Sequence, residues 1–293
     1  MIGAVEAGGT KFVLAVANGV DEVLNRTVIH TRTPSETFPE MVQWFEAAAA
    51  RHGAIGAFGI GSFGPIGLDP ARTGYATFTT TPKPGWPGAS FVDALASFGV
   101  PIKLDTDVNA AALGEWLRGA GRGCGSLAYT TVGTGIGSGV LKDGAVLAGW
   151  SHYESGHLLV RRDPARDSFE GVCSFHGDCL EGLASGPAIQ ARWGHDLSSA
   201  SGEQIALVAD YAAQLAAVLV LLHRPERLIF GGGVMKAPGM IDAVRPLTRE
   251  KLAGYIAEWD EELTHRIVLP ELGDDAGITG AIELGRRALE NQP

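Results

Sequence analysis

Positive charge is scarce in this chain of 293 residues. It has 23 Lys and Arg against 33 Asp and Glu, which gives a formal net charge of −10 at pH 7. A protein that binds nucleic acid needs basic side chains to neutralise phosphates, so this balance disfavours that class. Hydrophobic residues make up 45% of the chain, and the length leaves room for two globular domains.

Cysteine is also rare, with three in the whole chain: Cys124, Cys173 and Cys179. So few thiols predict no disulfide framework and a reducing compartment. The start, MIGAVEAGGTK, lacks the basic region and cleavage signal of an export peptide, so we expect a cytoplasmic protein. The longest apolar stretch, 205–222, is interrupted by Asp210 and Gln214, which favours a buried helix over a membrane span.

Several familiar nucleotide and hydrolase motifs are missing. No Walker A pattern or GxSxG nucleophile turn occurs. The GxGxxG at Gly59–Gly64 leads into a proline-rich loop instead of a helix, so it lacks the context of a dinucleotide site.

Glycine, in contrast, is abundant, with 41 residues gathered in short clusters. The first cluster follows Glu6 and reads Gly8, Gly9, Thr10, Lys11 between two apolar, strand-like runs. Residues without a Cβ let backbone amides approach an anion, and Glu6 would hold Mg²⁺ through water. An ordinary hairpin turn is an equally open interpretation.

Two further clusters have the same character. The second, Thr131–Gly139, alternates glycine with Thr131, Thr134 and Ser138, and Gly133 and Gly135 flank its turn. Such a turn suits a polyphosphate, although a glycine-kinked strand is the simpler alternative. The third, Gly231, Gly232 and Gly233, ends an apolar run and would let a flat ring or ribose pack on the backbone.

The elements expected along the chain alternate between strands and helices, and each half begins with a glycine-containing hairpin. This order predicts an α/β protein with two similar lobes and a cleft. We expect a smaller lobe over 1–107, with a terminal helix at about 277–293 packing back on it. A larger lobe covers 108–276 and carries a zinc-binding insertion at about 154–182.

Asp107 is the candidate catalytic residue, because it lies where an expected strand at 101–104 meets an expected helix at 108–117. Carboxylates at such a junction line the ligand-binding crevice of α/β sheets. Asp107 would accept a proton from an attacking hydroxyl, and Asn109 would hold a second hydroxyl. The simpler interpretation is that both residues only cap the helix.

The strongest local pattern is CxxHxxC at Cys173, His176 and Cys179, with His157 upstream. Two thiolates and two imidazoles complete a closed, structural zinc site; the alternative is two buried thiols near unrelated histidines. Carboxylates and an imidazole beside this loop would bind sugar hydroxyls. The candidates are Glu154, His157 and Glu181, which composition alone does not separate from Glu170 and Asp178.

These motifs together resemble the ROK family of sugar kinases, and within it the bacterial fructokinases. The similarity runs through EAGGTKF, DTDVNAAALGE, TVGTGIGSG, SHYESGHLLVRR, CSFHGDCLEGLASGPAI, LIFGGGVM and LGDDAGITGA, which span nearly the whole chain. The CxxHGDC pattern is typical of the fructokinase branch, whereas the glucokinase branch usually has CxCGxxGC. Two departures are Glu6, where Asp is more frequent in the family, and Tyr153, where proline is expected.

The resemblance implies a duplicated, ribonuclease H-like fold of the actin and hexokinase type, with Mg·ATP in the cleft between the lobes. It implies transfer to the 6-hydroxyl of D-fructose, with Asp107 as base and Asn109, Glu154, His157 and Glu181 at sugar-contacting positions. The glycine clusters match the ATP-binding segments, His157, Cys173, His176 and Cys179 match the zinc ligands, and family members are commonly dimers. Alternatives are a broader hexokinase, or a sugar-sensing regulator, which an acidic chain without a preceding DNA-binding segment disfavours.

Overall fold

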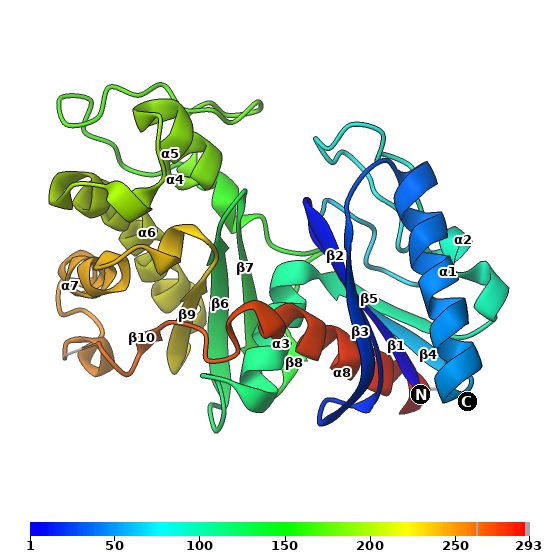
Figure 1. The fold of residues 1–293 in the computed structure, drawn as a ribbon. Coiled ribbons are helices and arrows are strands. Elements are labelled where there is room, and N and C mark those ends of the chain that lie inside the picture. Colours follow the sequence, from blue (N-terminus) through cyan, green and yellow to red (C-terminus); the bar gives the residue numbers. More distant parts are fainter. Residues whose placement is uncertain (262, 291–293) are drawn as a thin grey trace. The chain divides into compact units, whose positions relative to one another are not determined.

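The computed structural model describes residues 1–261 and 263–290 and divides them into two compact units. Unit 1 comprises Met1–Leu117, Ala148–His152 and the chain from Asp274 onward, and unit 2 comprises Arg118–Leu147 and Tyr153–Gly273. Each unit contains one five-stranded sheet (Figure 1).

The sheet of unit 1 has the order β3-β2-β1-β4-β5. Its strands are β1 (Ile2–Ala7), β2 (Lys11–Gly19), β3 (Glu22–His30), β4 (Ala57–Ser62) and β5 (Ile102–Thr106). The first three strands are antiparallel neighbours, whereas β4 pairs parallel with β1 and β5 pairs parallel with β4.

Both faces of this sheet are buried, which explains the apolar runs of β1 and β2. Val5, Phe12 and Leu14 face helix α1 (Pro34–His52), and the residues between them, such as Ala4 and Val13, face helix α8 (Ala276–Glu290). The two-residue period of a strand therefore supplies two hydrophobic cores, one on each side of the sheet. Figure 1 shows α1 and α8 beside this sheet.

Helix α8 lies very close to the sheet because glycines remove the side chains between them. A Cβ on Gly59 would lie 1.9 Å from the Ala281 carbonyl oxygen. The expected terminal helix extended to residue 293, and residues 291–293 lie outside the described part. Helix α3 (Asp107–Arg118) also packs on α8, where a Cβ on Gly280 would lie 1.7 Å from the Ala110 oxygen. Consequently almost all of α3 belongs to unit 1, whereas the sequence placed the lobe boundary after residue 107.

Unit 2 repeats the same strand topology. Its sheet has the order β10-β9-β6-β7-β8, built from β6 (Ser126–Val132), β7 (Ile136–Lys142), β8 (Ala145–Val146), β9 (Arg227–Gly231) and β10 (Ile267–Val268). The β6–β7–β8 strands are antiparallel, and β9 and β10 continue from β6 in parallel. The hairpin-first order expected from the sequence is thus present in both units.

The helices of unit 2 are α4 (Leu180–Ala184), α5 (Gly186–Trp193), α6 (Gly202–His223) and α7 (Met240–Leu252). Helix α6 is long and apolar enough to cross a membrane, but 56% of its most apolar window is buried inside the protein. Its Asp210 forms an ion pair of 2.6 Å with Lys251 of α7. We therefore interpret α6 as the central core helix of unit 2.

Candidate active site

The β1–β2 turn holds the first glycine cluster in a tight conformation. The Gly8 amide donates to the Lys11 carbonyl oxygen at 2.9 Å, and the Gly8 carbonyl accepts from the Thr31 hydroxyl at 2.7 Å. A Cβ on Gly8 would lie 3.0 Å from the Lys11 oxygen, so the turn favours glycine there. Gly9, Thr10 and Lys11 are exposed, as a loop that receives an anion requires.

Lys83 is a basic residue at this turn that sequence reasoning missed. Its ammonium group donates to the Gly9 carbonyl oxygen at 2.6 Å, across 74 positions of sequence. Lys83 lies in a proline-rich loop without a recognisable motif, so the local sequence did not predict its contact with Gly9. It adds positive charge beside the exposed end of the β1–β2 turn.

Asp107 is the first residue of α3, directly after β5. Its Oδ1 accepts a hydrogen bond of 2.8 Å from the Val108 amide, so the side chain does contact the helix start. Asp107 is half-buried, and its negative charge interacts with the carboxyl group of the neighbouring Glu6. Burial, and next the charge of Asp107, raise the pKa of Glu6 from an ordinary 4.5 to about 7.

Glu6 itself occupies a confined position on β1. A Cβ on Gly277 of α8 would lie 2.5 Å from the Glu6 carboxyl carbon. Within the described residues, the buried Oε2 of Glu6 has no hydrogen-bond partner. An unsatisfied buried carboxylate oxygen beside a second carboxylate is the donor set that a hydrated Mg²⁺ ion prefers.

Asn109 is buried, and its side-chain amide donates to Asp105 Oδ1 at 2.6 Å. The Thr106 amide donates to the same oxygen at 2.8 Å, and the Asn109 amide bonds to the Thr106 hydroxyl at 3.2 Å. Burial raises the pKa of Asp105, and these hydrogen bonds oppose the increase. Asp105 thus orients Asn109, whose contact with a sugar hydroxyl stays a prediction.

In unit 2, the β6–β7 turn contains the second glycine cluster. The Gly133 amide donates to Gly135 at 2.9 Å, and the Gly186 amide donates to the Gly133 carbonyl at 2.7 Å. Glu181 closes the other side, because its Oε2 accepts from the Ile136 amide at 2.9 Å. A Cβ on Gly135 would lie 2.8 Å from the same Glu181 oxygen. Glu181 therefore contacts this turn, and its predicted role in sugar binding remains a prediction.

The three glycines after β9 have different roles. A Cβ on Gly231 would lie 2.3 Å from the Tyr129 hydroxyl oxygen. Gly232 has a φ of 91° and lies against the Val132 carbonyl, so both glycines are required by packing on β6. Gly233 has open space around its Cβ position and lines a pocket.

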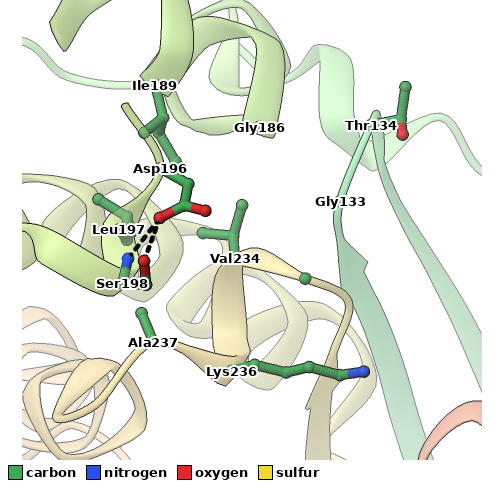
Figure 2. A pocket seen from close by; sticks show the side chains of 11 residues that line it. Gly133, Thr134, Gly186, Ile189, Asp196, Leu197, Ser198, Val234, Lys236 and Ala237 are labelled. Carbon is green, nitrogen blue, oxygen red and sulfur yellow. Dashed lines mark hydrogen bonds between the residues drawn. The ribbon is translucent and has the colours of Figure 1, made fainter. Parts of the chain in front are cut away.

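This pocket lies wholly within unit 2 and has a volume of about 420 Å³, within the range of small-molecule sites. Figure 2 shows it between the β6–β7 turn, the start of α5 and the segment after β9. Its lining combines backbone from three glycines with apolar and polar side chains: Gly133, Thr134, Gly186, Ile189, Asp196, Leu197, Ser198, Gly233, Val234, Lys236 and Ala237. Gly133, Thr134 and Gly233 were predicted to bind ATP, whereas the residues from α5 through 198 were not predicted.

The four predicted metal ligands lie together. One ligand atom from each of His157, Cys173, His176 and Cys179 lies within 4.8 Å of all the others. His157 Nδ1 is 3.8 Å from Cys173 Sγ and 3.5 Å from Cys179 Sγ. Zinc bonds of about 2.3 Å to sulfur and about 2.0 Å to nitrogen, at tetrahedral angles, separate N and S by roughly 3.5 Å. The donor set and its spacing therefore fit zinc.

Burial raises the pKa of the Cys179 thiol to about 11, and the neighbouring Cys173 thiol adds to the increase. A bound cation would offset this effect and stabilise both thiolates. Backbone bonds between Cys173 and Gly177, at 2.9 and 3.1 Å, hold the loop closed.

Glu154 and His157 flank a short turn that packs on β7. A Cβ on Gly156 would lie 2.0 Å from the Ile136 carbonyl oxygen, and Ser155 donates to Ser138 at 2.8 Å. Glu154 is exposed, while the preceding Tyr153 packs against the core, with its ring 5.5 Å from that of His223. Glu154, His157 and Glu181 therefore belong to unit 2, whereas Asp107 and Asn109 belong to unit 1.

The duplicated hairpin-first topology defines an α/β protein of the actin-like ATPase class, with a glycine turn after the first strand of each unit. The chain belongs to the ROK family, whose family model matches residues 2–288.

Relatives with known names align over almost the whole length. The chain is 42% identical to a fructokinase of Zymomonas mobilis, covering 99% of this chain and 97% of the relative. It is 38% identical to a fructokinase of Pediococcus pentosaceus, covering 99% of both. Among solved structures, a ROK family glucokinase from Streptomyces griseus in complex with glucose and AMPPNP has a TM-score of 0.72. Their identity is 26%, over 98% of this chain and 99% of the other.

Proposed function

We propose that this protein transfers the γ-phosphoryl group of ATP to the 6-hydroxyl of D-fructose. The observation that carries the proposal is the alignment with fructokinases at about 40% identity over nearly their full length. The CxxHGDC pattern, which contains three of the four predicted metal ligands, is typical of the fructokinase branch and agrees with fructose as the substrate. The glucose and AMPPNP complex of the Streptomyces griseus relative supports a hexose and an adenine nucleotide as the substrates.

In this reaction Asp107 accepts the proton of the attacking hydroxyl as the phosphoryl group is transferred. Phosphoryl transfer needs mainly positioning and charge stabilisation, and the two glycine turns supply backbone amides for the phosphates. Glu6 would hold Mg²⁺ through water, a role that its unpartnered oxygen beside Asp107 supports. Asn109, Glu154, His157 and Glu181 bind the sugar hydroxyls.

His157, Cys173, His176 and Cys179 hold a structural Zn²⁺ ion. Four protein ligands leave no open coordination position, so the zinc has no direct part in phosphoryl transfer, and a zinc hydrolase is disfavoured. A zinc ion bound by these four residues would fix the loop that precedes Glu181, whose carboxylate contacts the β6–β7 turn.

We further propose that the protein is a cytoplasmic homodimer. Both statements rest on the resemblance to ROK sugar kinases, and the scarcity of cysteine agrees with a reducing compartment. Light scattering of the purified protein measures the subunit number directly, and a monomer at micromolar concentration would contradict the dimer.

A coupled assay with Mg·ATP and a panel of hexoses tests the substrate. We expect kcat/KM for fructose to exceed the values for glucose, mannose and N-acetylmannosamine. Equal values would favour a broader hexokinase, and sugar binding without turnover would favour a sugar-sensing regulator. Asp93, an exposed residue of helix α2 (Phe91–Ala94), provides a control for substitution of the proposed base Asp107. Asp93→Asn is expected to keep full activity.

A further inference from the structure

Asp196 supplies the negative charge among the side chains that line the pocket of unit 2. The other lining residues near it are mostly apolar: Ile189, Leu197, Val234 and Ala237. Such walls fit the faces of a flat aromatic ring, whereas a lone carboxylate fixes one polar edge of that ring. Asp196 is therefore a carboxylate among mostly apolar neighbours in this lining.

The side chain of Asp196 is held in place by its own loop. Its Oδ1 accepts hydrogen bonds from the Ser198 amide at 2.8 Å and from the Ser198 hydroxyl at 2.5 Å. The His195 imidazole donates through Nδ1 to the Asp196 carbonyl oxygen at 2.7 Å. The two hydrogen bonds from Ser198 orient the carboxylate without a ligand, so little rotamer freedom is lost on binding.

The second oxygen, Oδ2, has a different environment. Among residues 1–261 and 263–290, no donor bonds to it, and Figure 2 shows it pointing toward the space between the lining residues, where Asp196 is exposed. The hydrogen bonds from Ser198 lower the pKa of Asp196, so at neutral pH the group is ionised and can only accept hydrogen bonds. The pocket thus presents one fixed acceptor to its ligand.

We propose that Asp196 selects adenine nucleotides, with Oδ2 accepting a hydrogen bond from the exocyclic amine of the base. This inference rests on the proposed function, because it takes the pocket as the nucleotide site. A purine with a carbonyl group in that place would direct an oxygen lone pair at the carboxylate, which disfavours inosine and guanosine triphosphates. Ser198 acts through Asp196 and is a positioning residue.

The test compares kcat/KM for ATP and ITP, with fructose as acceptor, in the wild-type protein and in Asp196→Asn. The wild type is expected to prefer ATP by about tenfold or more, the usual effect of one mismatched polar contact. Asn can donate to the inosine carbonyl, so the variant is expected to lose most of this preference. Its KM for ATP rises and its KM for ITP falls, while KM for fructose is unchanged. Glu203→Gln removes an exposed charge of unit 2 outside the pocket lining, and should leave the ratio unchanged.

An unchanged ratio in Asp196→Asn would overturn the inference, as would equal weakening of both nucleotides, the result expected if Asp196 bound the ribose. Calorimetry of ADP and IDP binding without sugar separates this result from a failure of the proposed function. If fructose is not phosphorylated, the function is wrong, yet a preference for ADP that Asp196→Asn removes would still support the role of Asp196. Absence of ADP binding, or equal binding of ADP and IDP, would refute it.

Discussion

Glu6→Gln gives the most direct test of the electrostatics around Asp107. Burial raises the pKa of Glu6 from 4.5 to about 7, so the folded protein binds a proton there more tightly than the unfolded chain does. Stability is therefore expected to fall as pH rises from 4.5 to about 7, because ionising Glu6 in the folded state becomes costly. Above pH 7 the full cost is present.

The size of the effect follows from the pKa difference. At 1.36 kcal/mol for each pKa unit, the change corresponds to about 3 kcal/mol, an upper value because solvent relaxation reduces it. Gln has the shape of the protonated side chain and carries no charge. Glu6→Gln is therefore expected to raise the free energy of unfolding by about 1–3 kcal/mol at pH 8, with little change at pH 4.5.

Urea denaturation at both pH values, without nucleotide or Mg²⁺, measures this difference. Glu46→Gln on the exposed face of α1 is a matched control and should have the same small effect at both pH values. Equal effects of Glu6→Gln at pH 4.5 and pH 8 would refute the raised pKa. Activity gives a second readout: the variant should need more Mg²⁺ for half-maximal turnover if Glu6 holds the hydrated ion.

Three other perturbations address separate parts of the protein. Asp107→Asn is expected to lower kcat by about 10²–10⁴-fold with ADP binding kept, and a decrease below tenfold would exclude a general base there. Gly135→Ala places a methyl group against the Glu181 carboxylate and should raise KM for ATP more than KM for fructose; unchanged ATP kinetics would argue against a phosphate-binding turn. Cys179→Ser should remove the zinc found by elemental analysis and lower Tm, and the site would be wrong if the wild-type protein contained no zinc.

Sequence patterns were sufficient where a structure depends on local periodicity and end signals. The apolar stretch 205–222, expected as a buried helix, lies within α6, which begins after a capping box formed by Ser201 and Gln204. The sequence pattern favours one helix over 89–98, whereas the structure has the shorter α2 followed by a 3₁₀ turn. Helices α4 and α5 were missed because small residues and Pro187 obscure their periodicity.

The candidate site was predictable only in part, for a related reason. The predicted metal ligands Cys173, His176 and Cys179 are close in sequence, and their spacing alone indicates a metal site. In contrast, the contact of Glu181 with the Ile136 amide joins residues 45 positions apart, and Lys83 meets Gly9 across 74 positions. A local sequence pattern does not predict such long-range contacts, because they depend on the tertiary positions of the loops.

The packing of α8 on the sheet of unit 1 has a consequence for biosynthesis. A ribosome makes β1 and β2 first, but the helix that covers Ile2, Ala4 and Val13 comes at the other end of the chain. Until α8 has been synthesised, one side of that early sheet lacks its partner and exposes apolar surface to other nascent chains. Stop codons shortly before residue 276 should therefore yield insoluble or chaperone-bound products, although unit 2 is already complete in them.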